Sequence, residues 1–235
     1  MKMQNATALV TGAGRGLGRA LVQASVEAGA RRVYATGRDL RRLEALAAEW
    51  PEVVVPLALD ITDARSVAEA AARVGELSVL FNNAGVIAAG GVLASSPDAV
   101  VREFETNVFG TLAVTRAFLP ALERAAPAGG AAIVNVLSVA SLANVPLFGV
   151  YAAAKAASLS LTQALRVALA DKGVRVHAVA YDMPKTSPEL VAQAIVAGVE
   201  ADEEDICPDP TSQQLYTQWQ SDPRAVARAL GAMTG

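Results

Sequence analysis

The chain has 235 residues, of which 53% are hydrophobic, and its formal net charge at neutral pH is −3. This length suffices for one well-buried α/β core, so we expect a single domain over residues 1–235, and a weakly acidic chain gives no electrostatic reason to expect a nucleic acid partner. The only cysteine, Cys207, excludes an internal disulfide. No apolar run reaches the roughly 18 residues of a membrane span, and residues 1–4 carry no secretory signal, so we expect a cytoplasmic location and no membrane partner.

Hydrophobic periodicity predicts strands that alternate with helices along the chain. The predicted strands are residues 6–10, 32–36, 53–59, 78–81, 131–137 and 174–179, with a short seventh at 203–207. The predicted helices are about 17–27, 39–49, 63–74, 97–123, 151–170, 187–198 and 222–233. This alternation predicts a Rossmann-type, doubly wound parallel sheet of about seven strands in a three-layer α/β/α fold, with ligands at the carboxyl ends of the strands.

A glycine-rich turn joins the first predicted strand to the first helix. Its sequence is Thr11-Gly12-Ala13-Gly14-Arg15-Gly16-Leu17-Gly18. Glycines permit positive φ, let a phosphate approach the backbone, and leave the N–H groups of the next helix facing it. Because an ordinary surface turn has the same composition, this motif alone does not establish a phosphate site.

Two arginines favour NADP(H) over NAD(H), although NAD(H) stays an alternative. The second predicted strand ends in Thr36-Gly37-Arg38-Asp39, where an acidic residue would bind a ribose 2′-hydroxyl. Here Gly37 leaves room and Arg38 offers a cation for a 2′-phosphate, which Arg15 of the glycine turn would share. Both arginines could equally be solvated surface charges.

Further polar residues follow the strands that form the expected ligand-binding edge. Asp60 and Ile61 follow the third strand, Asn82-Asn83-Ala84-Gly85 closes the fourth, and Ser138 ends the fifth. Asn and Gly are also common turn formers, so the Asn-Asn-Ala-Gly run could be a plain turn. Asn107 lies inside the predicted helix 97–123, where an amide more often faces solvent than takes part in catalysis.

Tyr151 and Lys155 stand four residues apart at the start of a predicted helix, so both side chains project on one face. A nearby ammonium favours the phenolate and lowers the pKa of a phenol from about 10, which suits proton transfer near neutral pH. Ser138 could hydrogen-bond the same substrate oxygen. The alternative is that the pair is only the amphipathic edge of a helix.

Together these motifs resemble the short-chain dehydrogenase/reductase family over nearly the whole chain. The matching residues, in the expected order and spacing, are Thr11-Gly12-x-x-x-Gly16-x-Gly18, Asn82-Asn83-Ala84-Gly85, Asn107, Ser138 and Tyr151-x-x-x-Lys155. The resemblance implies that Tyr151 is the general acid/base and that Ser138 holds the carbonyl or hydroxyl oxygen. It further implies that Lys155 binds the nicotinamide ribose and lowers the Tyr151 pKa, and that Asn107 holds a water in a proton relay.

The same resemblance implies that Asp60 contacts the adenine and Asn83 the adenine-side ribose. The expected cofactor-binding residues are Gly12, Arg15, Gly16, Leu17, Gly18, Arg38, Asp60, Ile61, Asn83, Ala84, Gly85, Tyr151 and Lys155. We expect no metal site: His177, the only histidine, is expected to be a satisfied structural residue, and Cys207 a packing residue.

The chain departs from the family after the sixth strand. The family usually has Pro-Gly there, then residues that bind the nicotinamide carboxamide, a Thr and a substrate lid, whereas this chain continues Ala178-Val179-Ala180-Tyr181-Asp182-Met183. The Pro-Gly and about ten lid residues are absent between Ala180 and Tyr181. Either the connection is shortened and the nicotinamide site is open, or a segment of the natural chain is missing from the sequence at this point.

We therefore expect an oxidoreductase that interconverts a ketone or aldehyde and an alcohol with NADP(H). The expected pocket residues, Val86, Ile87, Val139, Leu147 and Phe148, favour a hydrophobic small-molecule substrate. The alternatives are an NADP(H)-binding regulator or scaffold without turnover, and a lyase or epimerase that retains its cofactor. Small residues on helix 151–170, Ala152 with Ala156 and Ala154 with Ala157, would let a neighbouring helix approach. In the resembled family this helix and the Asn107-bearing helix commonly pack across a dimer interface. We therefore expect a homodimer or homotetramer.

Overall fold

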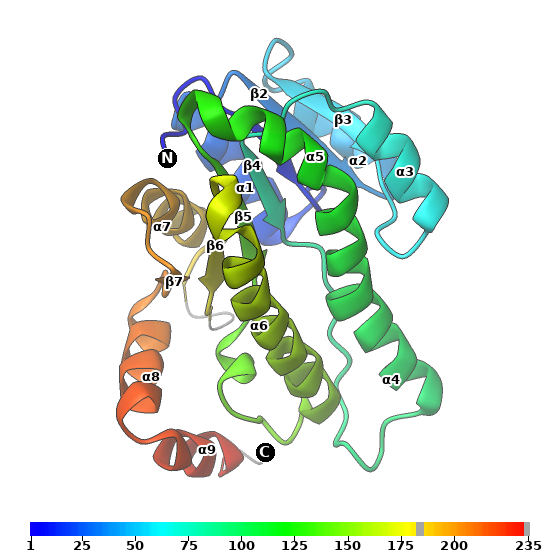
Figure 1. The fold of residues 1–235 in the computed structure, drawn as a ribbon. Coiled ribbons are helices and arrows are strands. Elements are labelled where there is room, and N and C mark those ends of the chain that lie inside the picture. The colour runs from blue at the N-terminus through cyan, green and yellow to red at the C-terminus, as the bar shows by residue number, and fades with distance from the viewer. Residues whose placement is uncertain (182–185, 233–235) are drawn as a thin grey trace.

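The computed structural model describes residues 1–181 and 186–232, and its strands form one parallel sheet (Figure 1). Within these residues seven strands lie in the order β3-β2-β1-β4-β5-β6-β7. Their bounds are β1 Thr7–Val10, β2 Arg32–Gly37, β3 Val54–Ala58, β4 Val79–Asn82, β5 Ala131–Val136, β6 Val174–Val179 and β7 Asp205–Ile206. Every neighbouring pair is parallel. The predicted doubly wound sheet is therefore confirmed.

Helices cover both faces of the sheet and bury two separate cores. On one face lie α1 (Gly16–Glu27), α2 (Leu40–Ala47) and α7 (Pro188–Ala201), which contribute Leu21, Leu43 and Ile195. On the other lie α3 (Ala64–Ala72), α5 (Thr111–Gly129) and α6 (Gly149–Leu169), which contribute, among others, Phe118 and Leu169. Since the strands are covered on both faces, their near-continuous apolar sequence is what a parallel sheet requires.

The single helix predicted at residues 97–123 is wrong, because a wider turn interrupts it. Helix α4 covers Pro97–Phe104, a π-helical turn (η1) covers Glu105–Gly110, and α5 begins at Thr111. A Cβ added at Gly110 would lie only 3.0 Å from Ile61 Cγ1 and from the Ile61 carbonyl oxygen, so this turn passes close to the segment after β3. The turn directs Asn107 inward, where it is 2% exposed, instead of toward solvent.

The chain after β6 continues along the edge of the sheet without an inserted segment. The Ala180 N–H donates to the Ile206 carbonyl at 3.0 Å, and the Val139 N–H donates to the Tyr181 carbonyl at 3.2 Å. Ala180 and Tyr181 are neighbours in the 235-residue sequence under both interpretations of this connection, and both stay predictions. The rest of the departing run, residues 182–185, lies outside the described residues.

The C-terminal part differs most from the prediction. Strand β7 has two residues instead of five, and helix α8 (Pro210–Ser221) was not predicted. Asp209 starts α8 in a capping box with Ser212, whose N–H donates to the Asp209 carboxylate at 2.9 Å. Helix α9 covers Pro223–Gly231, and Met233 of the predicted terminal helix lies outside the described residues. Helix α8 contacts the 3₁₀ turn η2 (Val139–Ser141), just beyond the end of β5.

Among the described residues, no helix combines the length and apolar character that crossing a bilayer demands.

Candidate active site

The glycine turn between β1 and α1 is a narrow backbone cradle. Gly12 and Gly16 have φ of +68° and +53°, a region that side chains disfavour. A Cβ added at Gly18 would lie 2.2 Å from the Gly12 carbonyl oxygen and 2.6 Å from Asn83 Nδ2, so no side chain fits there. The N-cap residue Arg15 makes no side-chain cap, which leaves the first N–H groups of α1 available to an anion.

Thr11 and Asn83 fasten this turn to the end of β4. Thr11 Oγ1 accepts the N–H groups of Asn83 and Ala84, each at 2.9 Å. Asn83 Nδ2 donates to the Thr11 carbonyl at 2.8 Å and to the Gly12 carbonyl at 3.4 Å. The Asn83 side chain, predicted to contact a ribose, thus serves here to hold the glycine turn in shape.

The two arginines predicted to bind a 2′-phosphate have exposed side chains. Neither Arg15 nor Arg38 forms an ion pair with a carboxylate in the part of the chain that the structure describes, whereas Arg42 Nε lies 3.1 Å from Asp39 Oδ2. Asp60 accepts hydrogen bonds from the Thr62 N–H and hydroxyl. Burial opposes ionisation of Asp60, but these bonds and the Arg38 charge together lower its pKa.

Ser138, Tyr151 and Lys155 come together at the carboxyl end of β5. Ser138 begins η2 just beyond the strand, and its side chain hydrogen-bonds the buried Tyr151 phenol. Lys155 lies one turn along α6; its Nζ donates to the Val136 carbonyl at 2.8 Å and lies 5.7 Å from the centroid of the Tyr151 ring. The phenol faces Ser138 and the sheet edge, as the proposed proton donor must.

The expectation that Lys155 makes Tyr151 unusually acidic is wrong for this structure. Burial raises the pKa of Tyr151 to about 12; the Ser138 hydrogen bond lowers it, but the charges of Glu103 and Tyr181 raise it further. Burial also lowers the pKa of Lys155 to about 8, against the opposing effect of Glu103. The desolvation of a phenolate therefore exceeds any help from the ammonium, which is directed at a backbone carbonyl.

Asn107 is held by a set of hydrogen bonds that extends to Glu103. Its Oδ1 accepts the Val86 N–H at 3.1 Å, and its Nδ2 donates to the Val86 carbonyl at 2.9 Å and to Glu103 Oε2 at 2.7 Å. Ser158 Oγ donates to the Asn107 carbonyl at 3.0 Å. Sequence reasoning missed Glu103; the available signal was an acidic residue four positions before Asn107.

Gly85 lets Asn107 and Lys155 approach the end of β4. A Cβ added at this glycine would lie 2.8 Å from Asn107 Oδ1 and 3.8 Å from Lys155 Nζ. Asn107, predicted to hold a water in a proton relay, and Lys155, predicted to bind the nicotinamide ribose, therefore flank one backbone position, next to the residues that fasten the glycine turn. The predicted catalytic residues and the predicted phosphate cradle consequently share one edge of the sheet.

His177 and Cys207 lie apart from this site: His177 is in β6, and Cys207 directly follows β7. His177 Nδ1 donates to the Glu203 carbonyl at 2.6 Å, but its buried Nε2 has no partner among the described residues, so the prediction of a satisfied histidine is only half right. Burial raises the pKa of Cys207 to about 12, which suits a packing role. No cluster of potential metal ligands occurs in the described part of the chain.

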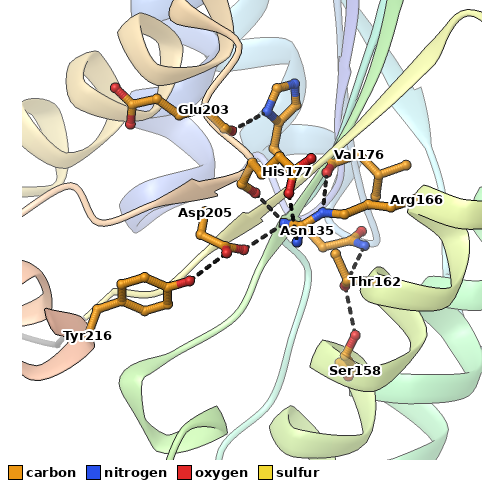
Figure 2. A network of polar contacts seen from close by, with 10 residues as sticks. Asn135, Ser158, Thr162, Arg166, Val176, His177, Glu203, Asp205 and Tyr216 are labelled. Carbon is orange, nitrogen blue, oxygen red and sulfur yellow. Dashed lines mark hydrogen bonds and ion pairs between the residues drawn. The ribbon is translucent and has the colours of Figure 1, made fainter. Parts of the chain in front are cut away.

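A polar network fastens α8 to the end of the sheet (Figure 2). Arg166 on α6 donates to the Val176 carbonyl at 2.9 Å and forms an ion pair with Asp205 at 2.6 Å. The Tyr216 hydroxyl of α8 donates to the other oxygen of Asp205 at 2.5 Å. These contacts join α6, β6, β7 and α8, and so hold α8 beside η2 and Ser138.

The fold and this sheet edge define a dinucleotide-binding α/β protein, and comparison with known proteins identifies the family. Residues 6–190 match the family model described as short chain dehydrogenase. The chain therefore belongs to the short-chain dehydrogenase/reductase family of oxidoreductases, as its motifs predicted.

Similar proteins include two dehydrogenases and one solved structure. The sorbitol dehydrogenase of Cereibacter sphaeroides is 38% identical over 186 residues, which cover 77% of this chain and 71% of that protein. The 2-keto-3-deoxy-L-fuconate dehydrogenase of Xanthomonas campestris pv. campestris is 36% identical over 231 residues, covering 97% and 74%. A short chain dehydrogenase from Burkholderia cenocepacia, solved in complex with NADP, is 35% identical with a TM-score of 0.89 and covers 100% of both chains.

Proposed function

We propose that this protein interconverts a ketone or aldehyde and an alcohol by hydride transfer with NADP(H). The observation that carries the proposal is the Tyr151 phenol, hydrogen-bonded to Ser138 and placed beside Lys155 and Asn107 at the sheet edge that also holds the glycine cradle. Oxidoreductase chemistry of this kind needs a proton donor next to a bound dinucleotide, and this edge combines the phenol with the glycine cradle that we propose as the dinucleotide site.

The residues present fit a phosphorylated dinucleotide. Gly12 and Gly16 have positive φ and Gly18 has no space for a Cβ, so the turn presents backbone without side chains, and the uncapped start of α1 suits a pyrophosphate. Arg15 and Arg38 are two exposed guanidinium groups suited to a 2′-phosphate. The rest of the proposed cofactor site would be formed by Leu17, Asp60, Ile61, Ala84 and Gly85, and the bound cofactor would supply the hydride.

The proposed proton step follows from the ionisation of Tyr151. With its pKa raised to about 12, the phenol is protonated at neutral pH and is therefore the acid in the reduction direction. Ser138 would hydrogen-bond the substrate oxygen while Tyr151 gives it a proton. Lys155 would hold the cofactor ribose, and Asn107 would keep the relay to solvent in place.

We infer a hydrophobic substrate from the two loops in front of Tyr151. Gly90 pairs with Phe148 in an isolated bridge, so the loop after β4 and the loop after η2 run side by side. Ile87, Leu93 and Leu147 on these loops are exposed, Leu93 to 99%. Exposed apolar side chains on these two loops favour an apolar substrate over the sugar-derived compounds for which the two dehydrogenase relatives are named.

The proposal is tested by the oxidation of NADPH and of NADH at 340 nm, with hydrophobic ketones and sugar-derived ketones as parallel panels. We expect kcat/KM to be at least about tenfold higher with NADPH, and the Arg15→Ala and Arg38→Ala variants to remove this preference, since each loses a charge-assisted contact. Equal efficiency with NADH would overturn the cofactor assignment.

The Tyr151→Phe variant tests the proton donor, because it keeps the ring and deletes the hydroxyl. Turnover should fall by about 10² to 10⁴, the usual range for a general acid, while NADPH binding stays near the wild-type value. Full turnover in this variant would exclude Tyr151 as the proton donor.

A second candidate is an NADP(H)-binding regulator or scaffold without turnover. The shortened connection after Ala180 favours it, because the segment that in the family binds the nicotinamide carboxamide is missing there. Calorimetric binding of NADPH without reduction of any carbonyl in either panel would support this candidate. Measurable turnover of one carbonyl compound would exclude it.

A further inference from the structure

Glu103 is a fully buried acidic residue at the end of α4, and no role in the proposed reaction has been given to it. Its exposed fraction is 0%, although glutamate is rarely buried without partners. It stands one residue before the last position of α4, so its side chain reaches inward next to the π-helical turn that carries Asn107.

Both oxygens of the Glu103 carboxylate accept N–H groups from segments of the site. One accepts the Ala88 N–H at 2.5 Å, and the other accepts Asn107 Nδ2 at 2.7 Å. Ala88 belongs to the loop after β4, which carries the exposed Ile87 and Leu93. The carboxyl group therefore ties this loop and Asn107 to α4, with both of its oxygens acting as acceptors.

Glu103 also interacts electrostatically with the proposed catalytic pair on α6. The charged or titratable groups that interact with Glu103 are Arg102 on its own helix and the α6 residues Lys155 and Tyr151. Tyr181 also interacts with Tyr151 and raises its pKa. Burial raises the pKa of Glu103, whereas the Ala88 N–H and the charges of Arg102 and Lys155 lower it. Among the described residues, Glu103 is the group whose charge favours the ammonium form of Lys155.

We propose that Glu103 is a positioning residue of the active site, whose buried carboxylate orients the Asn107 amide and supplies the negative charge opposite the Lys155 ammonium. The geometric basis is the pair of short hydrogen bonds to Ala88 and Asn107 and the shared approach of Asn107 and Lys155 to Gly85. This proposal deepens the proposed function, since it rests on Asn107 and Lys155 taking part in that reaction.

The test is the titration of Lys155 in the protein without substrate or cofactor. Lysine is rare here, with four in the chain, so the ¹³C signal of the Lys155 ε-carbon can be assigned by comparison with Lys155→Met. Because a neighbouring negative charge favours the ammonium, the Glu103→Gln variant should lower the Lys155 pKa by about one unit. The matched control is Glu105→Gln, which removes the same charge from an exposed position two residues away and should leave the titration unchanged.

The reciprocal measurement keeps the test decisive if the Glu103→Gln variant does not fold. In the Lys155→Met variant the loss of the ammonium must raise the pKa of the Glu103 carboxyl, seen in its ¹³C signal, by about the same amount. A Lys155 titration that is identical in wild type and Glu103→Gln, or a Glu103 titration insensitive to Lys155→Met, overturns the proposal. Absence of NADPH turnover in the wild type would instead refute the proposed function, and the two titrations would still decide the role of Glu103.

Discussion

Lys155 imposes a stability cost on the fold that depends on pH. Burial lowers the pKa of its ammonium from 10.5 to about 8, so above pH 8 the unfolded chain binds this proton more tightly than the folded protein does. The free energy of unfolding should therefore rise by about 3 kcal/mol in total as the pH increases from about 8 to 10.5. Below pH 8 the cost of the buried ammonium is present in full, and above pH 10.5 it is absent.

Urea unfolding of wild type and Lys155→Met at about pH 7.5 and about pH 10.5 measures this contribution. We expect the wild type to gain about 3 kcal/mol more than the variant over this interval. Titrating groups that do not interact with Lys155 are common to both proteins and cancel in the comparison. Parallel dependence of stability on pH in the two proteins would show that Lys155 is not desolvated as the structure indicates.

Gly18 is the position in the cradle that tolerates substitution least. A Cβ there would lie 2.2 Å from the Gly12 carbonyl oxygen, whereas a Cβ at Gly14 would meet Arg42 Cβ at 3.6 Å, an ordinary contact. Gly18→Ala should cost about 2 kcal/mol or more of stability and weaken NADPH binding by at least about tenfold, because backbone must move. Gly14→Ala, the matched control, should stay within about 0.5 kcal/mol of the wild type.

Thermal unfolding and calorimetric titration with NADPH compare the two glycine variants. If Gly18→Ala binds NADPH as tightly as Gly14→Ala does, the cradle does not hold the cofactor phosphates.

At the scale of elements, the two loops that meet at Gly90 and Phe148 should set substrate preference. Leu93 and Leu147 are exposed on them, so their replacement by serine should leave the fold unaffected and reduce only the contact with an apolar substrate. We expect the Leu93→Ser/Leu147→Ser protein to show a KM for a bulky hydrophobic ketone about 5- to 30-fold higher, with kcat little changed.

Steady-state measurement of KM with one bulky ketone and one short polar ketone tests the role of these two loops. The polar ketone is the internal control, because it gains nothing from apolar contact and its KM should not move. An equal change of KM for both ketones would mean that the leucines act through the structure of the loops and not through the substrate.

Local pattern was sufficient for the strands and for most helices of this fold. The strands are short apolar runs bounded by turn residues, and Asp39, Asp63 and Ser187 cap α2, α3 and α7 with their side chains. Helix α8 was missed because its glutamine-rich sequence has little amphipathic pattern; the capping signal of Asp209 followed by Pro210 was the feature that could have found it.

Long-range packing explains what the sequence could not predict about the site. The motif positions indicated that Ser138, Tyr151 and Lys155 would meet, since parallel strands end at one edge. The π-helical turn brings the backbone of Gly110 close to Ile61, and it carries Asn107, which hydrogen-bonds the buried Glu103. The raised Tyr151 pKa likewise depends on desolvation, which residue spacing does not report.

At the scale of the whole molecule, the face formed by α4, η1 and α6 offers a surface for a second copy of the chain. Val101, Phe109 and Val167 are 52%, 60% and 81% exposed on these elements. Of the four small residues predicted to receive a neighbouring helix, Ala152 and Ala154 are instead buried within this chain, which leaves the exposed Ala156 and the half-buried Ala157 for that role. Scattered apolar residues are normal on a surface, but this group lies on adjacent helices.

We therefore expect a homodimer or homotetramer built on this face, with the oligomer lost when a charge is placed in it. Light scattering of the wild type at micromolar concentration should give two or four times the chain mass of 24.2 kDa. The Phe109→Glu variant should give one chain mass, because a buried unpaired carboxylate is strongly unfavourable in an interface. The matched control is Leu190→Glu on α7, in the opposite helical layer, where a leucine is 59% exposed and the oligomer should persist. A wild type that is monomeric at this concentration, or a Phe109→Glu protein that stays oligomeric while Leu190→Glu dissociates, would place the interface elsewhere or remove it.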